Sequence, residues 1–290
     1  MTDPHTAGPI SSSVVCQYFG FFDGVPKSHY AQIVAKAPFD QCNLLILAFV
    51  HAVKNNNGVY VAQFTNWRDN NFPYDPNDSD IDRVKLVVKT ARQKNPNLRI
   101  LISLGWGTND AGNAASTPGP FADSVRALVQ TYDLNGIDID FESTSVEPGA
   151  LLTLAQQLRA SLNKANPPRP IVMTITPAQT DGLNASVLRA FDYTMPQSYG
   201  NNPGYADQYE EILGSYAQIV YGIDTEGYIG QTDDPTPYAA AAKTNHAAGI
   251  FGWRLDNDSL NPQNFPTYAN AIKMWQLMTA GRAERDRAIA

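Results

Sequence analysis

Three carboxylates lie close together in the stretch LNGIDIDFES, residues 134–143, where Asp138, Asp140 and Glu142 occupy alternate positions. Isoleucine or phenylalanine fills the positions between them. Successive side chains of a β-strand point to opposite faces, so the three acids share one face of this segment and the apolar residues share the other. A strand this apolar should be buried, and burying a carboxylate is costly unless the group is paired.

The chemistry of such a row depends on its protonation. Like charges in a poorly hydrated site raise one another's pKa, and their titrations are coupled. We expect one proton to be shared low in the row and Glu142 to be protonated at the top, which is the state that a general acid needs. A solvated strand with an acidic outer face and a calcium site are less favoured alternatives. The neighbouring apolar runs are typical of fully buried strands, and calcium ligands usually come from a flexible loop.

The segments that would position this row follow a regular alternation. Short apolar runs, typical of parallel strands buried on both faces, alternate with amphipathic segments typical of helices. The runs are Ser13–Phe21, Asn43–Val50, Leu98–Gly107, Leu134–Ser143, Pro170–Ala178, Tyr193–Gly200, Gln218–Asp224 and Gly249–Asp256. Helices are expected at Ser28–Lys36, Asp80–Lys94, Pro120–Tyr132, Glu147–Asn163, Asn184–Ala190, Tyr205–Tyr216, Pro237–Ala247 and Pro262–Arg282.

Eight strands, each followed by a helix, predict an α/β fold, a single-domain (β/α)8 TIM barrel over residues 13–279, with tails at 1–12 and 280–290. An open doubly wound sheet is the alternative, but its Gly-rich phosphate loop does not match GFFDG, where the first strand ends. In a barrel the apolar face of a strand packs on helices. The acid row would therefore point inward and rise toward the C-terminal rim, where barrel enzymes hold their catalytic groups.

Composition limits the partners. A net charge of −7 and a pI near 5.0 argue against nucleic acid and anionic membranes. No run of eighteen apolar residues predicts a membrane span, and the four histidines lack metal-ligand spacing. Cys16 and Cys42 are interpreted as buried free thiols rather than a disulfide. The N-terminus lacks the features of a secretory signal, but a leader can be absent from an expressed form, so we expect a secreted monomer and keep a cytoplasmic one as the alternative.

Several motifs together resemble one family. NGIDIDFE at Asn135–Glu142 is similar to the DGxDxDxE signature of glycoside hydrolase family 18, the chitinases and endo-β-N-acetylglucosaminidases. SLGW at Ser103–Trp106 is similar to the SxGG element on the family's third strand, and MPQSYG at Met195–Gly200 to its sixth-strand Met/Gln-x-Tyr element. GWRLDND at Gly252–Asp258 resembles its eighth-strand tryptophan segment. The resemblance covers residues 14–258 in the family's strand order.

Two positions depart from the family pattern. Asn135 stands in place of the first Asp of the signature, but it precedes the three inward acids. Trp106 stands in place of the second glycine of SxGG, where a bulky indole would narrow or line the cleft. About 25 residues separate the seventh and eighth predicted strands, too few for the small α+β insertion of some chitinases. The chain therefore resembles the compact group that includes plant-type chitinases.

The resemblance implies roles for five residues. Glu142 would protonate the glycosidic oxygen and then act as base toward water, while the substrate's N-acetyl oxygen is the nucleophile. Asp140 would hydrogen-bond the acetamido N–H and stabilise an oxazolinium-like intermediate. Asp138 would hold the proton that lets Asp140 carry charge, with Ser103 hydrogen-bonded below it. Tyr199 would donate its hydroxyl to the acetamido oxygen.

The same resemblance implies a substrate-binding set and no cofactor. Trp253 would form an aromatic floor under the reacting sugar, whose C–H face is apolar. Gln197 could bond a sugar hydroxyl, while Tyr18 and Phe49 could contact the acetyl group or belong to the barrel core. Further subsite aromatics would be Trp106, Trp67 and Tyr228.

The resemblance implies an endo-acting, retaining enzyme that binds chitin or N-acetylglucosamine oligosaccharides and cleaves their β-1,4 linkages. An endo-β-N-acetylglucosaminidase acting on N-glycans would use the same site chemistry. A chitin-binding lectin or a xylanase inhibitor could share the fold, since a fold does not fix a function. The presence of Glu142, Asp140 and Tyr199 favours an enzyme over these.

Overall fold

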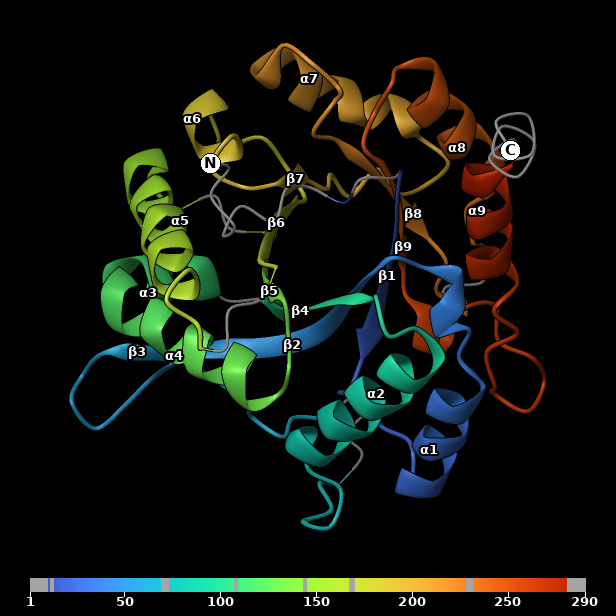
Figure 1. Cartoon of the computed structure of the whole chain (residues 1–290), viewed down its shortest axis with the longest axis horizontal. Coiled ribbons are helices and arrows are strands. Elements are labelled where there is room, and N and C mark those ends of the chain that lie inside the picture. The colour runs from blue at the N-terminus through green and yellow to red at the C-terminus, as the bar shows by residue number, and fades with distance from the viewer. Residues whose placement is uncertain are drawn as a thin grey trace.

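A computed structural model describes residue 10 and residues 13–68, 73–106, 109–142, 145–166, 170–227 and 232–280. In this part of the chain eight parallel strands surround a central axis, with helices outside them (Figure 1). The strands are β1 (Val14–Gly20), β2 (Leu44–Lys54), β4 (Arg99–Leu104), β5 (Gly136–Phe141), β6 (Val172–Pro177), β7 (Tyr193–Thr194), β8 (Val220–Asp224) and β9 (Gly249–Trp253).

The strands close into a barrel. Their order in the sheet is β7-β6-β5-β4-β2-β1-β9-β8. The two outermost strands meet where Thr194 forms a parallel bridge with Ile219, and the Thr194 N–H donates to the Gln218 carbonyl at 2.9 Å. The predicted (β/α)8 barrel is therefore confirmed, and the doubly wound alternative is wrong.

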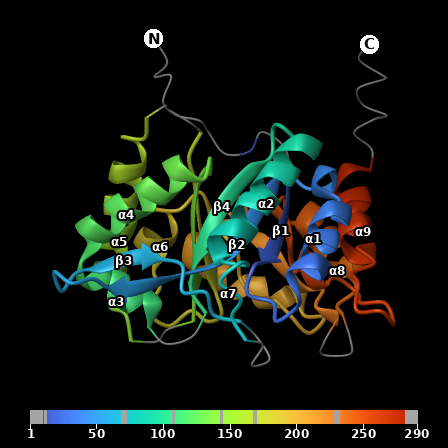
Figure 2. The ribbon, with the colours of Figure 1, turned by 90° about the horizontal axis from the view of Figure 1, so that it is seen from below.

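The helices form the outer layer, seen from the side in Figure 2. Helix α2 shows how the sequence sets a boundary, because the Ser79 hydroxyl accepts the N–H of Asp82 at 3.2 Å and caps its start. No helix of the described part is long and apolar enough to cross a membrane. The α-helices are α1 (Lys27–Lys36), α2 (Asp80–Lys94), α3 (Asp110–Ser116), α4 (Pro118–Thr131), α5 (Pro148–Leu162), α6 (Ala185–Leu188), α7 (Asp207–Leu213), α8 (Pro235–Thr244) and α9 (Ala269–Thr279), and the 3-10 helices are η1 (Phe39–Gln41), η3 (Pro203–Ala206) and η5 (Leu255–Asn257).

The barrel strands contribute to two separate apolar clusters, one on each of their faces. The larger cluster lies between strands and helices and contains Ile137, Ile139 and Phe141 of β5, so the acids of that strand point inward as predicted. A smaller cluster fills the barrel interior. Cys16 belongs to the inner cluster and Cys42 to the outer one. Both thiols are buried and free, which confirms the prediction.

An antiparallel hairpin beside the barrel differs from the sequence prediction. Strand β2 continues to Lys54, beyond its predicted end at Val50, and pairs with β3 (Tyr60–Gln63). The Asn55 side chain accepts the N–H groups of Asn57 and Val59 and closes the turn. This hairpin and helix α3 were not predicted.

Three other boundaries were predicted wrongly. Strand β7 ends at Thr194 and not at Gly200, because Pro196 has no N–H for a strand ladder. The helix predicted at residues 205–216 is replaced by η3, which begins at Pro203, followed by α7, which ends at Leu213. Helix α9 begins at Ala269, since a turn at Asn261–Asn264 occupies the predicted start. Its predicted end at Arg282 lies outside the described residues, as do nearly all residues of the two predicted tails.

Candidate active site

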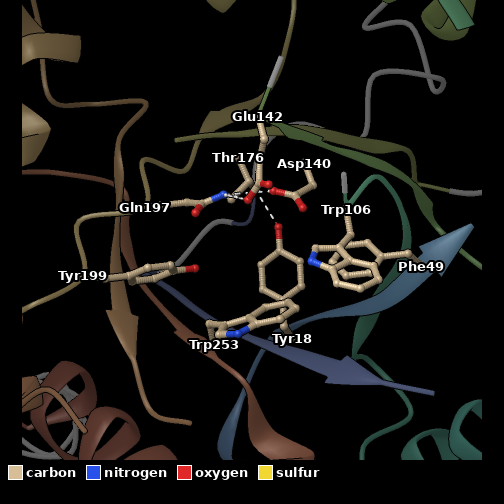
Figure 3. A pocket seen from close by; sticks show the side chains of 9 residues that line it. All are labelled: Tyr18, Phe49, Trp106, Asp140, Glu142, Thr176, Gln197, Tyr199 and Trp253. Carbon is tan, nitrogen blue, oxygen red and sulfur yellow. Dashed lines mark hydrogen bonds between the residues drawn. The ribbon is translucent and has the colours of Figure 1, made fainter. Parts of the chain in front are cut away.

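One pocket opens at the C-terminal ends of the barrel strands (Figure 3). Its lining residues come from seven of the eight barrel strands or from the residues that directly follow them. Eight of the ten predicted site residues line it, while Asp138 and Ser103 are fully buried and do not. The lining consists of Tyr18, Phe49, Trp106, Asp140, Glu142, Thr176, Gln197, Tyr199 and Trp253.

Asp138 sits inside a ring of hydroxyl groups. Its Oδ2 accepts hydrogen bonds from Ser103 Oγ at 2.6 Å and from the Tyr18 hydroxyl at 2.8 Å. Its Oδ1 accepts from Thr174 Oγ1 at 2.6 Å and from Thr176 Oγ1 at 2.9 Å. Complete burial raises the pKa of Asp138, although all four hydrogen bonds act in the opposite direction. The ring therefore fixes the carboxyl in place and leaves its proton affinity above that of a free aspartate.

The amide of Gln197 bridges the two upper acids. Its Nε2 donates to Asp140 Oδ1 at 3.0 Å and to Glu142 Oε1 at 3.2 Å. Gln197 was predicted to bond a sugar hydroxyl, and here its amide connects Asp140 of β5 with Glu142, which directly follows this strand. Burial raises the pKa of Asp140 well above its usual range, and the charges of Glu142 and Asp138 raise it further. Both lower acids of the row therefore bind a proton more tightly than a free aspartate does.

Exposure increases along the row. Asp138 is fully buried, Asp140 is partly exposed, and Glu142 is exposed at the rim. The poor hydration expected for the whole row holds for its lower members only, and a proton on Glu142 stays a prediction. Among the residues that the structure describes, no group of three or more His, Cys, Asp or Glu side chains is arranged to hold a metal ion.

The residues after β4 approach Asp140 closely. A Cβ on Gly105 would lie 2.5 Å from the Cβ of Asp140, so only glycine fits there. Trp106 follows in a left-handed conformation with φ of 66°, which costs a non-glycine residue roughly 1–3 kcal/mol. This is the position where the resemblance expected glycine. Trp106 is 47% exposed, and its ring lies to one side of Glu142 in Figure 3, so it lines the pocket without covering that acid.

Aromatic side chains form the floor opposite the acids. The Trp253 ring packs edge-on against Tyr18, with centroids 5.3 Å apart, and stacks on Phe49 at 5.7 Å. Its indole N–H donates to Glu226 Oε2 at 3.2 Å. The hydroxyl of Tyr199 points into the pocket (Figure 3), and burial raises the pKa of this phenol well above its usual range, so it remains a donor at neutral pH.

Several site residues were not found from the sequence. Thr174 and Thr176 alternate on β6 as the acids do on β5, and this pattern of polar residues in an apolar strand could have located them. Glu226 follows β8 in a polar segment with no distinguishing spacing.

Two further aromatic residues were predicted to contact the substrate. Trp67 is 41% exposed, and its ring centroid lies 4.6 Å from that of Trp106. Tyr228 lies outside the described residues.

Asp224 gives the first prediction, a dependence of stability on pH. It ends β8, and burial, followed by the charges of Glu226 and Asp233, raises its pKa to about 6. The folded state therefore binds this proton more tightly than the unfolded state, in which the pKa is about 4. The stabilisation is complete below about pH 4 and is lost as the pH rises through about 6.

Replacing this acid should flatten that dependence. Asp224→Asn keeps the oxygen that accepts the Glu226 N–H and removes the titration. Between pH 4 and pH 7 its melting temperature, measured by circular dichroism, should rise relative to that of the wild type. A constant difference between the two proteins across this range would contradict the raised pKa.

Comparison with known proteins adds to this geometry. Residues 14–219 match the sequence profile of the glycosyl hydrolases family 18. The chain belongs to this family. Chitinase B of Serratia marcescens is 27% identical over 215 residues, which cover 69% of this chain and 37% of that protein. The chain therefore spans little more than a third of that relative's length.

Solved structures of a chitinase and of a chitinase-like protein share the barrel. A class V chitinase from Nicotiana tobaccum superposes with a TM-score of 0.69 at 13% identity, covering 92% of this chain and 99% of that one. The chitinase-like agglutinin from Robinia pseudoacacia superposes with a TM-score of 0.65 at 13% identity, covering 91% and 99%. At such low identity these likenesses show a common fold and leave the activity to be argued from the site.

Proposed function

We propose that this family 18 protein is an endo-acting, retaining glycoside hydrolase that cleaves β-1,4 linkages of N-acetylglucosamine polymers such as chitin. The observation that carries the proposal is the row from buried Asp138 to exposed Glu142. That row faces the Tyr199 hydroxyl and the Trp253 ring across one pocket. Family membership and the chitinase named among its relatives support it.

The first step breaks the glycosidic bond. Glu142 gives its proton to the glycosidic oxygen, and the bond between that oxygen and C1 breaks with its electron pair going to the oxygen. The acetamido carbonyl oxygen of the same sugar attacks C1 and closes an oxazolinium ring, as family 18 chemistry requires. Tyr199 would donate to that carbonyl oxygen and Asp140 would accept the acetamido N–H, so both groups orient the nucleophile.

The second step restores the enzyme. Glu142 accepts a proton from water as the water oxygen attacks C1, and the bond from C1 to the acetamido oxygen breaks. Because C1 is inverted twice, the product keeps the β configuration. Throughout, negative charge on Asp140 would stabilise the oxazolinium cation, and Asp138 beneath it would take up the shared proton.

A platform of aromatic rings links the pocket to the exposed Trp106 and Trp67, and it favours a polymeric substrate. From Phe49, which stacks on Trp253, the rings continue to Phe22 at 5.8 Å and then to Trp106 at 6.2 Å, with interplanar angles of 17° and 6°. Trp67 completes the platform beside Trp106. Flat apolar surfaces suit the C–H faces of successive sugar rings, so more than one residue of a chain could bind.

Shortening this platform should affect long substrates most. Trp106→Ala removes an exposed ring that stacks on Phe22 and should raise KM for an N-acetylglucosamine hexamer about fivefold, with a smaller effect on a trimer. Steady-state kinetics on both oligomers measures this. Tyr74→Ala removes another exposed aromatic ring that does not line the pocket and should change neither value. An equal rise in KM for the hexamer and the trimer would contradict binding along the platform.

Two substrates decide between the chitinase and its closest alternative. The protein is incubated with N-acetylglucosamine oligomers and, separately, with a high-mannose glycoprotein, and products are identified by mass spectrometry. Cleavage of internal linkages in the oligomers supports the proposal. Glycan release without oligomer cleavage would instead identify an endo-β-N-acetylglucosaminidase.

A sugar-binding protein without activity is the second candidate, favoured by the fold shared with a chitinase-like agglutinin. The described pocket retains Asp140, Glu142 and Tyr199, and Trp106 does not cover Glu142. Oligosaccharide binding without hydrolysis by the wild-type protein would establish this candidate.

A further inference from the structure

We propose that Glu226, which follows β8, is a positioning residue that fixes the orientation of the Trp253 ring in the pocket floor. This inference rests on the proposed function, because it assigns Trp253 to the reacting sugar. It concerns a residue outside the pocket lining, held by contacts on the far side of that ring.

Packing alone leaves one movement of the Trp253 ring open. Tyr18 and Phe49 contact it through apolar surfaces, which resist tilting but have no directional preference within the ring plane. The hydrogen bond from the indole N–H to Glu226 Oε2 at 3.2 Å supplies that direction. A partly buried indole N–H also needs an acceptor to avoid a desolvation penalty.

The carboxylate of Glu226 is itself held at its second oxygen. Its Oε1 accepts from Arg254 Nε at 3.2 Å and from Asn257 Nδ2 at 3.0 Å. Its own N–H donates to Asp224 Oδ1 at 3.0 Å. Three donors on two oxygens leave the carboxylate little freedom to rotate, so it forms a fixed acceptor for Trp253.

Arg254 anchors this arrangement in the interior. It is fully buried, forms ion pairs with Asp23 and Asp256, and lies 4.5 Å from the ring centroid of Phe22 in the platform. Burial lowers the pKa of Arg254, but these carboxylates, together with Glu226, outweigh that effect and raise the pKa above its usual range, so Arg254 stays charged.

Gly20, the last residue of β1, shows how closely Arg254 is packed. A Cβ on Gly20 would lie 2.1 Å from Arg254 Nη1, and the Gly20 N–H donates to Asp256 Oδ1 at 2.6 Å. The anchor is therefore built into the end of β1, and one network reaches both the platform and the floor.

This geometry predicts that an amide cannot replace the carboxylate. Both oxygens of Glu226 face N–H donors, so the NH2 group of Gln at this position would always oppose a donor, whichever way the amide turned. Glu226→Gln should lower kcat/KM for the hexamer about tenfold, mostly through KM. Glu211→Gln, on the exposed face of α7, is the matched control and should have no effect.

A double-mutant cycle tests whether Glu226 acts through Trp253. Trp253→Phe keeps an aromatic ring but removes the N–H donor together with part of the indole surface, so Glu226→Gln should cost less than about twofold in that background. A tenfold loss in both backgrounds would show that Glu226 acts by another route and would overturn the proposal. So would wild-type kinetics in Glu226→Gln.

A readout without substrate separates this inference from the proposed function. In protein labelled with 5-fluorotryptophan, the Trp253 signal is the one missing in Trp253→Phe. Glu226→Gln should shift that fluorine resonance and leave those of Trp67, Trp106 and Trp275 in place. An unshifted signal would overturn the inference even if the enzyme is active, whereas a shifted signal with no hydrolysis by the wild type would overturn only the function.

If Glu226→Gln does not fold, Glu226→Asp is the second variant, because it keeps the negative charge beside Arg254 and withdraws the carboxylate from the indole N–H. A severalfold loss of kcat/KM that shrinks in the Trp253→Phe background supports the hydrogen bond. Wild-type kinetics in Glu226→Asp, or an equal loss in both backgrounds, would overturn it.

Discussion

Glu142→Gln should lower kcat for the N-acetylglucosamine hexamer about 10³-fold while leaving its dissociation constant within about threefold of the wild type. The substitution keeps the size of the side chain and an oxygen that can accept from Gln197, but it removes the proton that the glycosidic oxygen needs. Glu142 is exposed at the rim, so the fold should be unaffected. Turnover by product chromatography and binding by calorimetry measure the two effects separately.

The same two measurements can contradict the assignment of Glu142 as the catalytic acid. If the Gln variant hydrolyses the hexamer within about tenfold of the wild-type rate, another group supplies the proton and the assignment of Glu142 is wrong. If binding is lost together with turnover, Glu142 holds the substrate rather than reacting with it.

Asp140→Asn is the second large effect that we expect, a loss of about 10²–10³ in kcat. The amide carries no charge to stabilise the oxazolinium cation. Its NH2 group would also compete with the acetamido N–H or oppose the Gln197 amide, which now donates to Asp140 Oδ1. Steady-state kinetics on the hexamer gives the loss, and the melting temperature shows whether the hydroxyl ring around Asp138 survives.

Asp40→Asn provides the control for this variant. Asp40 is exposed in η1, which precedes β2 and so lies at the opposite end of the barrel from the pocket. It should keep wild-type kinetics. An Asp140→Asn enzyme that is as active as the Asp40→Asn enzyme would remove Asp140 from the chemistry.

The sequence predicted the barrel and the orientation of β5 because both depend on local alternation. Ile137, Ile139 and Phe141 could only face the helices, and this placed the acids inside. The barrel prediction also placed most of the pocket residues at one rim, because the C-terminal ends of neighbouring parallel strands meet there. Family resemblance added Tyr199 and Trp253, whose spacing carries no signal of its own.

What the sequence could not predict depends on contacts between distant segments. The Gln197 amide joins two acids that lie 57 and 55 positions away in the chain, and the hydrogen bond between Trp253 and Glu226 spans 27 positions. Pro196 ended β7 early despite an apolar pattern, because a missing N–H outweighs hydrophobicity in a ladder. The sequence showed that Trp106 stands where the family has glycine, but it did not show that the Trp106 ring stacks on Phe22.

The most direct test of the central claim is the configuration of the first product. Proton NMR recorded during hydrolysis of an N-acetylglucosamine hexamer shows which anomer forms before mutarotation mixes the two. Substrate-assisted cleavage with Glu142 as acid and base predicts that the new reducing ends appear as the β-anomer. Initial formation of the α-anomer, or an unchanged hexamer, would contradict the account.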